Sequence, residues 1–211
     1  MAANPTLVTP EPSPPYPVRL YIMRPTTQSK LLNFPAFGWL FRYVLLIPHL
    51  LMLYALQVTG LLAWWLATWG ILFTGRYPRG LFRLNVGVMR WYMGVYSYLF
   101  SLFDEFPPMD LDQRPERELI LEVDYTATSS RWLNLPFFPL KLILVVPHLI
   151  IVYALASAAF VCALIGQFAI LFTGSFPVGL HRFIVGVQRW SARMYGYLLG
   201  FTDEYPPFSM A

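Results

Sequence analysis

The chain has 211 residues, of which 57% are hydrophobic, 18% aromatic and only 12% charged. The charged share is about half that of an average soluble domain, which is too little to cover a soluble globule of this size. The high hydrophobicity also excludes a disordered chain, and a single cysteine excludes a disulfide scaffold. We therefore expect an integral membrane protein.

Fifteen Lys and Arg against eleven Asp and Glu give a net charge of +4. Because the basic residues flank apolar segments, we expect membrane lipids with anionic head groups as partners, and no nucleic acid. We also expect a protein partner or a second copy of the chain. Residues 1–15 contain no secretory signal, and their Pro, Ser and Thr content predicts a disordered tail.

The sequence repeats itself after 99 residues. The word PHL at 48–50 recurs at 147–149, ILFTG at 71–75 recurs at 170–174, and DEFPP at 104–108 recurs as DEYPP at 203–207. Without a gap, about 27 of the 61 positions from 48 to 108 are identical in the second copy. We therefore divide the chain into repeat 1 (16–108), a linker (109–116) and repeat 2 (117–211), related by pseudo-two-fold symmetry.

Each copy is predicted to begin with a short strand. Apolar residues alternate with other residues over 18–23 and again over 118–123. This period of two is typical of strands, and we expect the two to pair as a small sheet outside the membrane.

A long apolar segment follows, from Tyr43 to Gly75 in the first copy and from Leu142 to Leu180 in the second. About 33 residues in one helix would measure roughly 50 Å, against a hydrocarbon core of about 30 Å. One interpretation is an in-plane helix followed by a tilted crossing that begins at Pro48 or Pro147. The other is a helical hairpin that turns near 57–60 and 156–159.

The distribution of Lys and Arg favours the hairpin interpretation, because hairpins leave all fifteen on the cytoplasmic side. The fold class that we expect is an all-α integral membrane protein with about four membrane-embedded segments, interfacial amphipathic helices and a small two-stranded β element. Both termini would be cytoplasmic. Gly75 and Gly174 are expected to end the long segments as C′ glycines. The residues predicted to form the repeated structural motif are Pro48, His49, Gly75, Pro78, Pro147, His148, Gly174 and Pro177.

The last part of each copy, 81–103 and 180–202, carries arginines and small residues on one predicted helical face. One interpretation is a helix in the membrane interface with its basic face toward head groups; the other is a seam where glycines allow close packing. We expect Arg83 and Arg182 to face lipid, and Arg90 and Arg189 to pair with the acids of the DEFPP and DEYPP words. Those acids are alternatively expected to bind Arg76, Arg79 or Arg182. The residues predicted to contact lipid or a partner are Arg83, Arg90, Arg182, Arg189, Arg193, Trp91 and Trp190.

The words PHL, ILFTGRYPRGLF, GV-x-RW and DEFPP resemble those of a bacterial membrane-protein family known only as domain of unknown function 4389. The resemblance covers nearly everything from Tyr16 to Phe208 and includes two tandem copies. The second copy departs from the family pattern at Ser175 and Val178, where the first has Arg76 and Arg79. The resemblance implies a bacterial plasma-membrane location, and it brings no activity, cofactor or catalytic residue.

We predict that the protein is not an enzyme, with no catalytic residues and no metal site, because the sequence has no nucleophile elbow, HExxH, phosphate loop, dinucleotide fingerprint or CxxC pair. His49 and His148 are the strongest candidates for a ligand-binding function, since they occupy the same position in both copies. As a symmetric pair they would ligate haem or a pigment; alternatively each donates to a backbone carbonyl. Three functions remain open: an accessory or scaffold protein, which we favour, a haem- or pigment-binding electron-transfer subunit, and a small transporter. The last is disfavoured because the long segments lack intramembrane acids.

Overall fold

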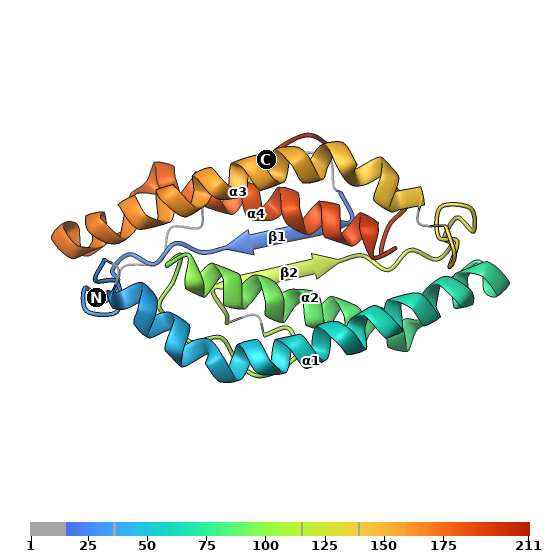
Figure 1. The fold of residues 1–211 in the computed structure, drawn as a ribbon, viewed down its shortest axis with the longest axis horizontal. Coiled ribbons are helices and arrows are strands. Elements are labelled where there is room, and N and C mark those ends of the chain that lie inside the picture. Colours follow the sequence, from blue (N-terminus) through green and yellow to red (C-terminus); the bar gives the residue numbers. More distant parts are fainter. Residues whose placement is uncertain (1–15, 36, 115, 139) are drawn as a thin grey trace.

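The computed structural model describes residues 16–35, 37–114, 116–138 and 140–211. The predicted disordered tail, 1–15, lies outside the described residues. Each copy consists of a strand, a long helix and a shorter helix that folds back on it (Figure 1). The elements are β1 (Val18–Ile22), α1 (Phe37–Thr74), α2 (Arg79–Leu99), β2 (Leu119–Val123), α3 (Leu140–Thr173) and α4 (Val178–Leu198). The repeated, mostly helical architecture with a small sheet is thus confirmed.

An approximate two-fold axis passes through the centre of the sheet. β1 and β2 pair antiparallel with Leu20 opposite Leu121, and these residues occupy equivalent positions in the two copies. The rotation that exchanges the strands also exchanges α1 with α3, so these two helices run in opposite directions (Figure 1).

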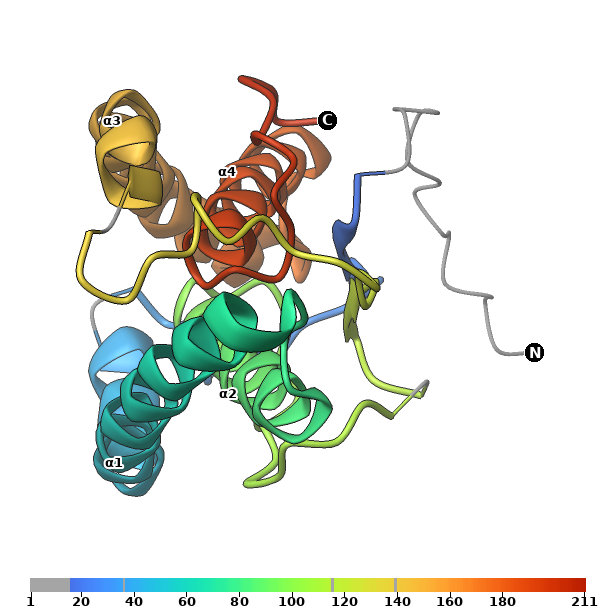
Figure 2. The same cartoon turned by 90° about the vertical axis from the view of Figure 1, so that its right-hand side faces the viewer.

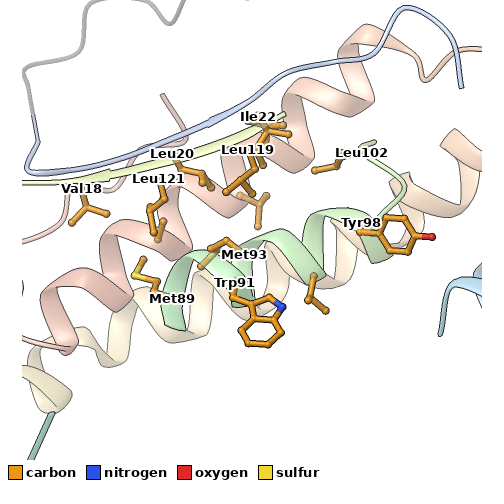
Figure 3. Packing of buried hydrophobic residues seen from close by; sticks show 14 of the residues in the cluster. Val18, Leu20, Ile22, Met89, Trp91, Met93, Tyr98, Leu102, Leu119 and Leu121 are labelled. Atoms are coloured by element: carbon orange, nitrogen blue, oxygen red, sulfur yellow. The ribbon is translucent and has the colours of Figure 1, made fainter. Parts of the chain in front are cut away.

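The molecule has three layers, seen along its length in Figure 2. The long helices α1 and α3 form one face, α2 and α4 form the middle layer, and the sheet forms the opposite face. The side chains of Leu20 and Leu121 point from the sheet toward Met89 and Met93 of α2, and all four are at most 5% exposed (Figure 3). The core therefore lies between the sheet and the middle layer.

The two copies exchange their strands. β1, from the first copy, packs on α4 of the second, whereas β2 packs on α2 of the first. At Gly196 of α4 the packing is so close that an added Cβ would lie 2.5 Å from Val18 Cγ2. Neither copy therefore has a complete core by itself.

The predicted hairpins are wrong, because α1 and α3 continue without a turn at 57–60 or 156–159. Pro48 and Pro147 lie inside these helices rather than at a first helical position. Each proline removes one hydrogen bond within its helix. A buried seam along α1 explains why the helix nevertheless continues, since it packs the helix against the rest of the protein on both sides of Pro48. The seam consists of Leu46, His49, Leu53, Gly60, Ala63, Ala67 and Ile71.

Gly75 and Gly174 end the long helices, as predicted. Their φ angles are 71° and 75°, in the left-handed region that glycine adopts without a Cβ penalty. Each N–H donates to the carbonyl four residues earlier, at 2.7 and 2.8 Å. Pro78 and Pro177, in extended conformation, then precede the first residues of α2 and α4.

Candidate functional site

The outer face of α1 and α3 exposes apolar side chains along both helices. Segments Leu40–Thr74 and Leu140–Thr173 are long and apolar enough to cross a membrane, by length and composition, and only 22% of the most apolar window of each is buried. The most exposed side chains form equivalent pairs in the two copies: Leu51 with Ile150, Tyr54 with Tyr153 and Phe73 with Phe172, between 67% and 78% exposed. The surface is therefore a repeated feature of the fold.

The loops before the long helices also expose apolar side chains. Leu31 is 86% exposed and Trp132 is 78% exposed, at equivalent positions before α1 and α3. A large apolar side chain at both positions adds a symmetric contact near each end of the molecule.

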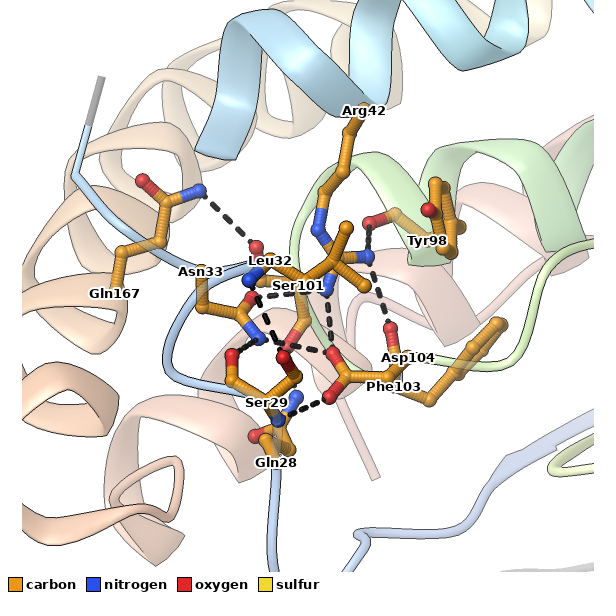
Figure 4. A network of polar contacts seen from close by, with 10 residues as sticks. All are labelled: Gln28, Ser29, Leu32, Asn33, Arg42, Tyr98, Ser101, Phe103, Asp104 and Gln167. Carbon is orange, nitrogen blue, oxygen red and sulfur yellow. Dashed lines mark hydrogen bonds and ion pairs between the residues drawn. The ribbon is translucent and has the colours of Figure 1, made fainter. Parts of the chain in front are cut away.

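A buried ion pair connects the start of α1 to the repeated acidic word of the first copy. The guanidinium of Arg42 is fully buried and donates to Asp104 Oδ1 at 2.5 Å and to Asn33 Oδ1 at 2.8 Å (Figure 4). Asp104 also accepts from the Ser29 backbone N–H at 2.6 Å and from Asn33 Nδ2 at 2.9 Å. The Arg42 guanidinium further lies 4.3 Å from the centre of the Tyr98 ring.

The second copy builds the same cluster with a lysine. Lys141 Nζ lies 2.8 Å from Asp203 Oδ1 and 4.8 Å from the centre of the Tyr197 ring. Asp203 accepts from the Ser130 backbone N–H at 2.5 Å and from Asn134 Nδ2 at 2.9 Å. In both copies the acid thus fixes the loop before the long helix to the segment after the short one.

The expected partners of these acids were wrong. Asp104 and Asp203 bind Arg42 and Lys141, and Glu105 binds Arg117 at 2.7 Å, rather than Arg76, Arg79, Arg90, Arg182 or Arg189. Arg42 and Lys141 stand 99 residues apart, the same offset as the acids, but Arg90 and Arg189 share this offset, so it did not distinguish the partners.

The arginine stripe of α2 and α4 packs on protein along most of its length. Arg90 donates to the carbonyls of Leu111, at 2.7 Å, and Leu121, at 3.4 Å. Arg189 donates to Leu20 O at 3.0 Å, and Arg193 donates to Ser209 O at 2.6 Å. Among the described residues, the hydrogen bonds of these arginines go to backbone carbonyls of the strands, of the linker and of the C-terminal segment of the second copy.

The glycines of the stripe allow these segments to approach. A Cβ at Gly87 would lie 2.7 Å from Leu111 Cβ, and one at Gly186 would lie 2.9 Å from Met210 Cβ. Arg83 and Arg182, at the beginning of the stripe, are exposed. The other arginines of the stripe are half-buried or buried: Arg90, Arg189 and Arg193.

His49 and His148 lie beneath the proline-rich segment of their own copies. His49 Nε2 donates to Pro107 O at 2.8 Å, and the ring meets Phe106 edge-on. His148 Nδ1 accepts from Trp190 Nε1 at 2.8 Å. Its ring stacks on Phe208 with centroids 3.9 Å apart. The predicted partner-contacting residues Trp91 and Trp190 are buried against these rings, 6% exposed each. Among the described residues, no group of three or more His, Cys, Asp or Glu could hold a metal.

The face opposite α1 and α3 carries charge. Arg19 on β1 binds Glu122 at 3.2 Å and Asp124 at 2.7 Å, and all three side chains are partly exposed. Burial raises the pKa of the Glu118 carboxyl to about 7, and repulsion from Glu105 and Asp104 contributes to the same shift.

A cavity of about 670 Å³ lies between α2, α3 and α4, lined by mostly apolar side chains. A smaller cavity of about 280 Å³ lies at the equivalent place between α1, α2 and α4. The two share Tyr92 and Tyr195, whose rings meet edge-on with centroids 6.2 Å apart. The groove between the copies is thus apolar and follows the two-fold symmetry.

No curated protein and no solved structure matches this chain. One family model, described as domain of unknown function DUF4389, matches residues 38–109 and again residues 138–210. The matches begin just inside α1 and just before α3, and they include the long helix, the short helix and the acidic word of each copy. The chain therefore belongs to the DUF4389 family and contains two tandem copies of its domain.

Proposed function

We propose that this protein is a non-catalytic accessory or scaffold protein of the bacterial plasma membrane. It is held in the membrane by α1 and α3, associates with anionic lipids, and presents its charged face to a larger membrane complex. The observation that carries the proposal is the long, mostly apolar surface of α1 and α3, which is repeated in both copies; only 22% of the most apolar window of each helix is buried. Apolar surface of this extent, placed opposite a charged face, matches a membrane on one side and water on the other.

The charges support anionic lipid as the partner of the membrane side. Arg83 and Arg182 are exposed at equivalent positions in the second turns of α2 and α4, near the ends of the apolar helices. A basic side chain near an anionic membrane surface contributes roughly 1 kcal/mol of binding.

A scaffold role is supported by what the repeated polar residues do in the fold. Asp104 and Asp203 neutralise buried cations, and His49 and His148 each use a ring nitrogen within their own copy. These groups hold segments of the chain together. The charged sheet face remains available for a protein partner.

Membrane residence is tested by fractionation of a bacterial host that expresses the protein. We expect the protein in the membrane pellet after high-salt and alkaline carbonate washes, and in solution only after detergent. Release by carbonate would contradict the proposal. Co-purification in mild detergent after cross-linking from the sheet face identifies the partner complex, and recovery of the chain alone would contradict the accessory role.

Lipid preference is tested by flotation with vesicles of phosphatidylcholine, with and without phosphatidylglycerol. We expect the Arg83→Gln/Arg182→Gln variant to lose the preference for phosphatidylglycerol. The control Arg114→Gln, on the charged face, is expected to keep it, since Arg114 is a half-exposed partner of Asp110. Equal flotation of wild type with both vesicles would refute the anionic-lipid partner.

The absorption spectrum of the purified protein distinguishes the scaffold proposal from the alternative of a haem- or pigment-binding subunit. With His49 and His148 in structural roles, we expect no Soret band. A Soret band that disappears in His148→Ala would replace the scaffold proposal with the electron-transfer one.

A further inference from the structure

We propose that the protein lies flat in the cytoplasmic leaflet, with α1 and α3 in the plane of the membrane and the two-fold axis along the membrane normal. Neither helix then crosses the bilayer. This inference rests on the proposed membrane function and names the surface and the partner: one leaflet of lipid contacts the outer face of α1 and α3.

The first argument is length. With 38 and 34 residues, α1 and α3 measure about 57 and 51 Å, whereas the hydrocarbon core is about 30 Å thick. No Asp, Glu, Lys or Arg occurs from Tyr43 to Gly75, a stretch of about 50 Å in helical geometry. Fitting this stretch into the core would require a tilt of roughly 50°, beyond the usual range of about 0–40°. In the plane of the membrane its whole length contacts lipid without mismatch.

The second argument is the position of the charged sheet along the helices. Arg90 is the twelfth of the 21 residues of α2 and binds Leu121 of β2, and Arg189 is the twelfth of the 21 residues of α4 and binds Leu20 of β1. The sheet therefore lies at the middle of the molecule, not at an end, as Figure 1 also shows.

Upright helices would consequently place the sheet at the depth of the bilayer centre. The side chains of Arg19 and Glu122 on the sheet, and of Asp124 directly after β2, are 28%, 50% and 57% exposed. A charged side chain at that depth costs roughly 2.5–3.5 kcal/mol or more. In the flat arrangement the same side chains face water, because the sheet is the layer farthest from α1 and α3 (Figure 2).

The third argument is the distribution of polar residues over the faces. A crossing helix is apolar in its middle and polar at both ends, whereas α1 exposes Phe37, Tyr54 and Phe73, each 73%, near its start, middle and end. The apolar and polar parts are instead separated by face, which is the pattern of a protein that lies in the interface. This arrangement also keeps the exposed Lys and Arg on one side, as the positive-inside rule requires.

Gly80 and Gly179 provide a matched pair of positions for a test. They are equivalent residues in the first turns of α2 and α4, both are exposed, and no neighbouring atom lies within 4 Å of an added Cβ. Because α1 and α3 run in opposite directions, the two positions lie at opposite ends of the molecule (Figure 1). Upright helices would put them on opposite sides of the membrane, and the flat arrangement puts them on the same side.

The experiment uses single cysteines at Gly80, Gly179 and Asp112 in a Cys162→Ala background of the full chain, because Cys162 is the native cysteine. Right-side-out and inside-out vesicles of the host membrane are treated with a membrane-impermeant maleimide. Tyr54→Cys, in the middle of the apolar face, is the control that should react only after detergent is added.

We expect the cysteines at Gly80, Gly179 and Asp112 all to react in inside-out vesicles and none in right-side-out vesicles. Reaction of Gly80→Cys and Gly179→Cys from opposite sides would overturn the flat arrangement and leave membrane residence intact. A different result would show that the protein does not reside in the membrane at all. In that case carbonate would release the same variants, and Tyr54→Cys would react without detergent.

Discussion

The buried ion pairs allow a prediction in which one copy serves as the control for the other. Asp104→Asn keeps the size of the side chain and removes the charge that neutralises Arg42. The guanidinium is 0% exposed and retains only neutral acceptors, the carbonyls of Tyr98 and Phe103 and the amide oxygen of Asn33. Breaking a buried pair costs about 3–5 kcal/mol. Since Asp104 itself is 25% exposed, we expect the low end, about 3 kcal/mol.

Asp203→Asn removes the corresponding charge beside Lys141, which is 4% exposed. At neutral pH we again expect a loss of about 3 kcal/mol. Raising the pH distinguishes the two variants, because a lysine amine can give up its proton when buried without a partner, whereas a guanidinium stays charged. At about pH 9.5 the loss in Asp203→Asn should shrink by about 1 kcal/mol, and the loss in Asp104→Asn should not.

The assay is equilibrium unfolding by urea in mild detergent, followed by tryptophan fluorescence, at both pH values. Asp124→Asn is the control, because its ion pair with Arg19 is exposed and contributes less than about 1 kcal/mol. If Asp104→Asn is no less stable than Asp124→Asn, the buried pair does not hold the fold. If both variants respond alike to pH, the difference between Arg42 and Lys141 has no energetic consequence.

Three further predictions use the same measurement. Gly87→Ala should lower the free energy of unfolding by about 1–3 kcal/mol through overpacking. Gly94→Ala, where no atom lies within 4 Å of the new Cβ, should raise it by up to about 1 kcal/mol. Equal effects of the two substitutions would exclude close packing at Gly87. Arg90→Lys should lower the free energy of unfolding by about 1–2 kcal/mol, because one ammonium replaces a guanidinium that donates to two carbonyls. Arg83→Lys, at an exposed position, should leave stability unchanged. An equally neutral Arg90→Lys would argue against the two hydrogen bonds of Arg90. Glu118 has a folded pKa of about 7, above its unfolded value, so its contribution to stability is present at low pH and lost as the pH rises through about 7. Glu118→Gln should therefore exceed wild type by about 1–2 kcal/mol at pH 8, after allowing for solvent screening, and match it near pH 5; a constant difference would refute the titration.

The parts of the fold that depend on a few neighbouring residues were predicted from the sequence. Gly75 and Gly174 end their helices because only glycine adopts the left-handed conformation there without strain. The alternation of apolar residues predicted the strands, and the sequence motifs shared by the two copies revealed the duplication. Composition alone indicated a large apolar surface, which α1 and α3 present.

Only the tertiary structure decided which surfaces meet. The continuity of α1 through Pro48 depends on a seam with α2 that supplies more packing energy than one lost hydrogen bond removes. The cluster of Arg42, Asn33 and Asp104 joins residues up to 71 positions apart, and its second copy replaces the arginine with Lys141, so no local pattern marks it. Strand exchange likewise has no local signal, because either helix pair offers a similar apolar face to either strand. Long-range contacts between surfaces of similar composition are selected by shape and burial in the folded chain, and these are properties of the assembled layers rather than of any segment.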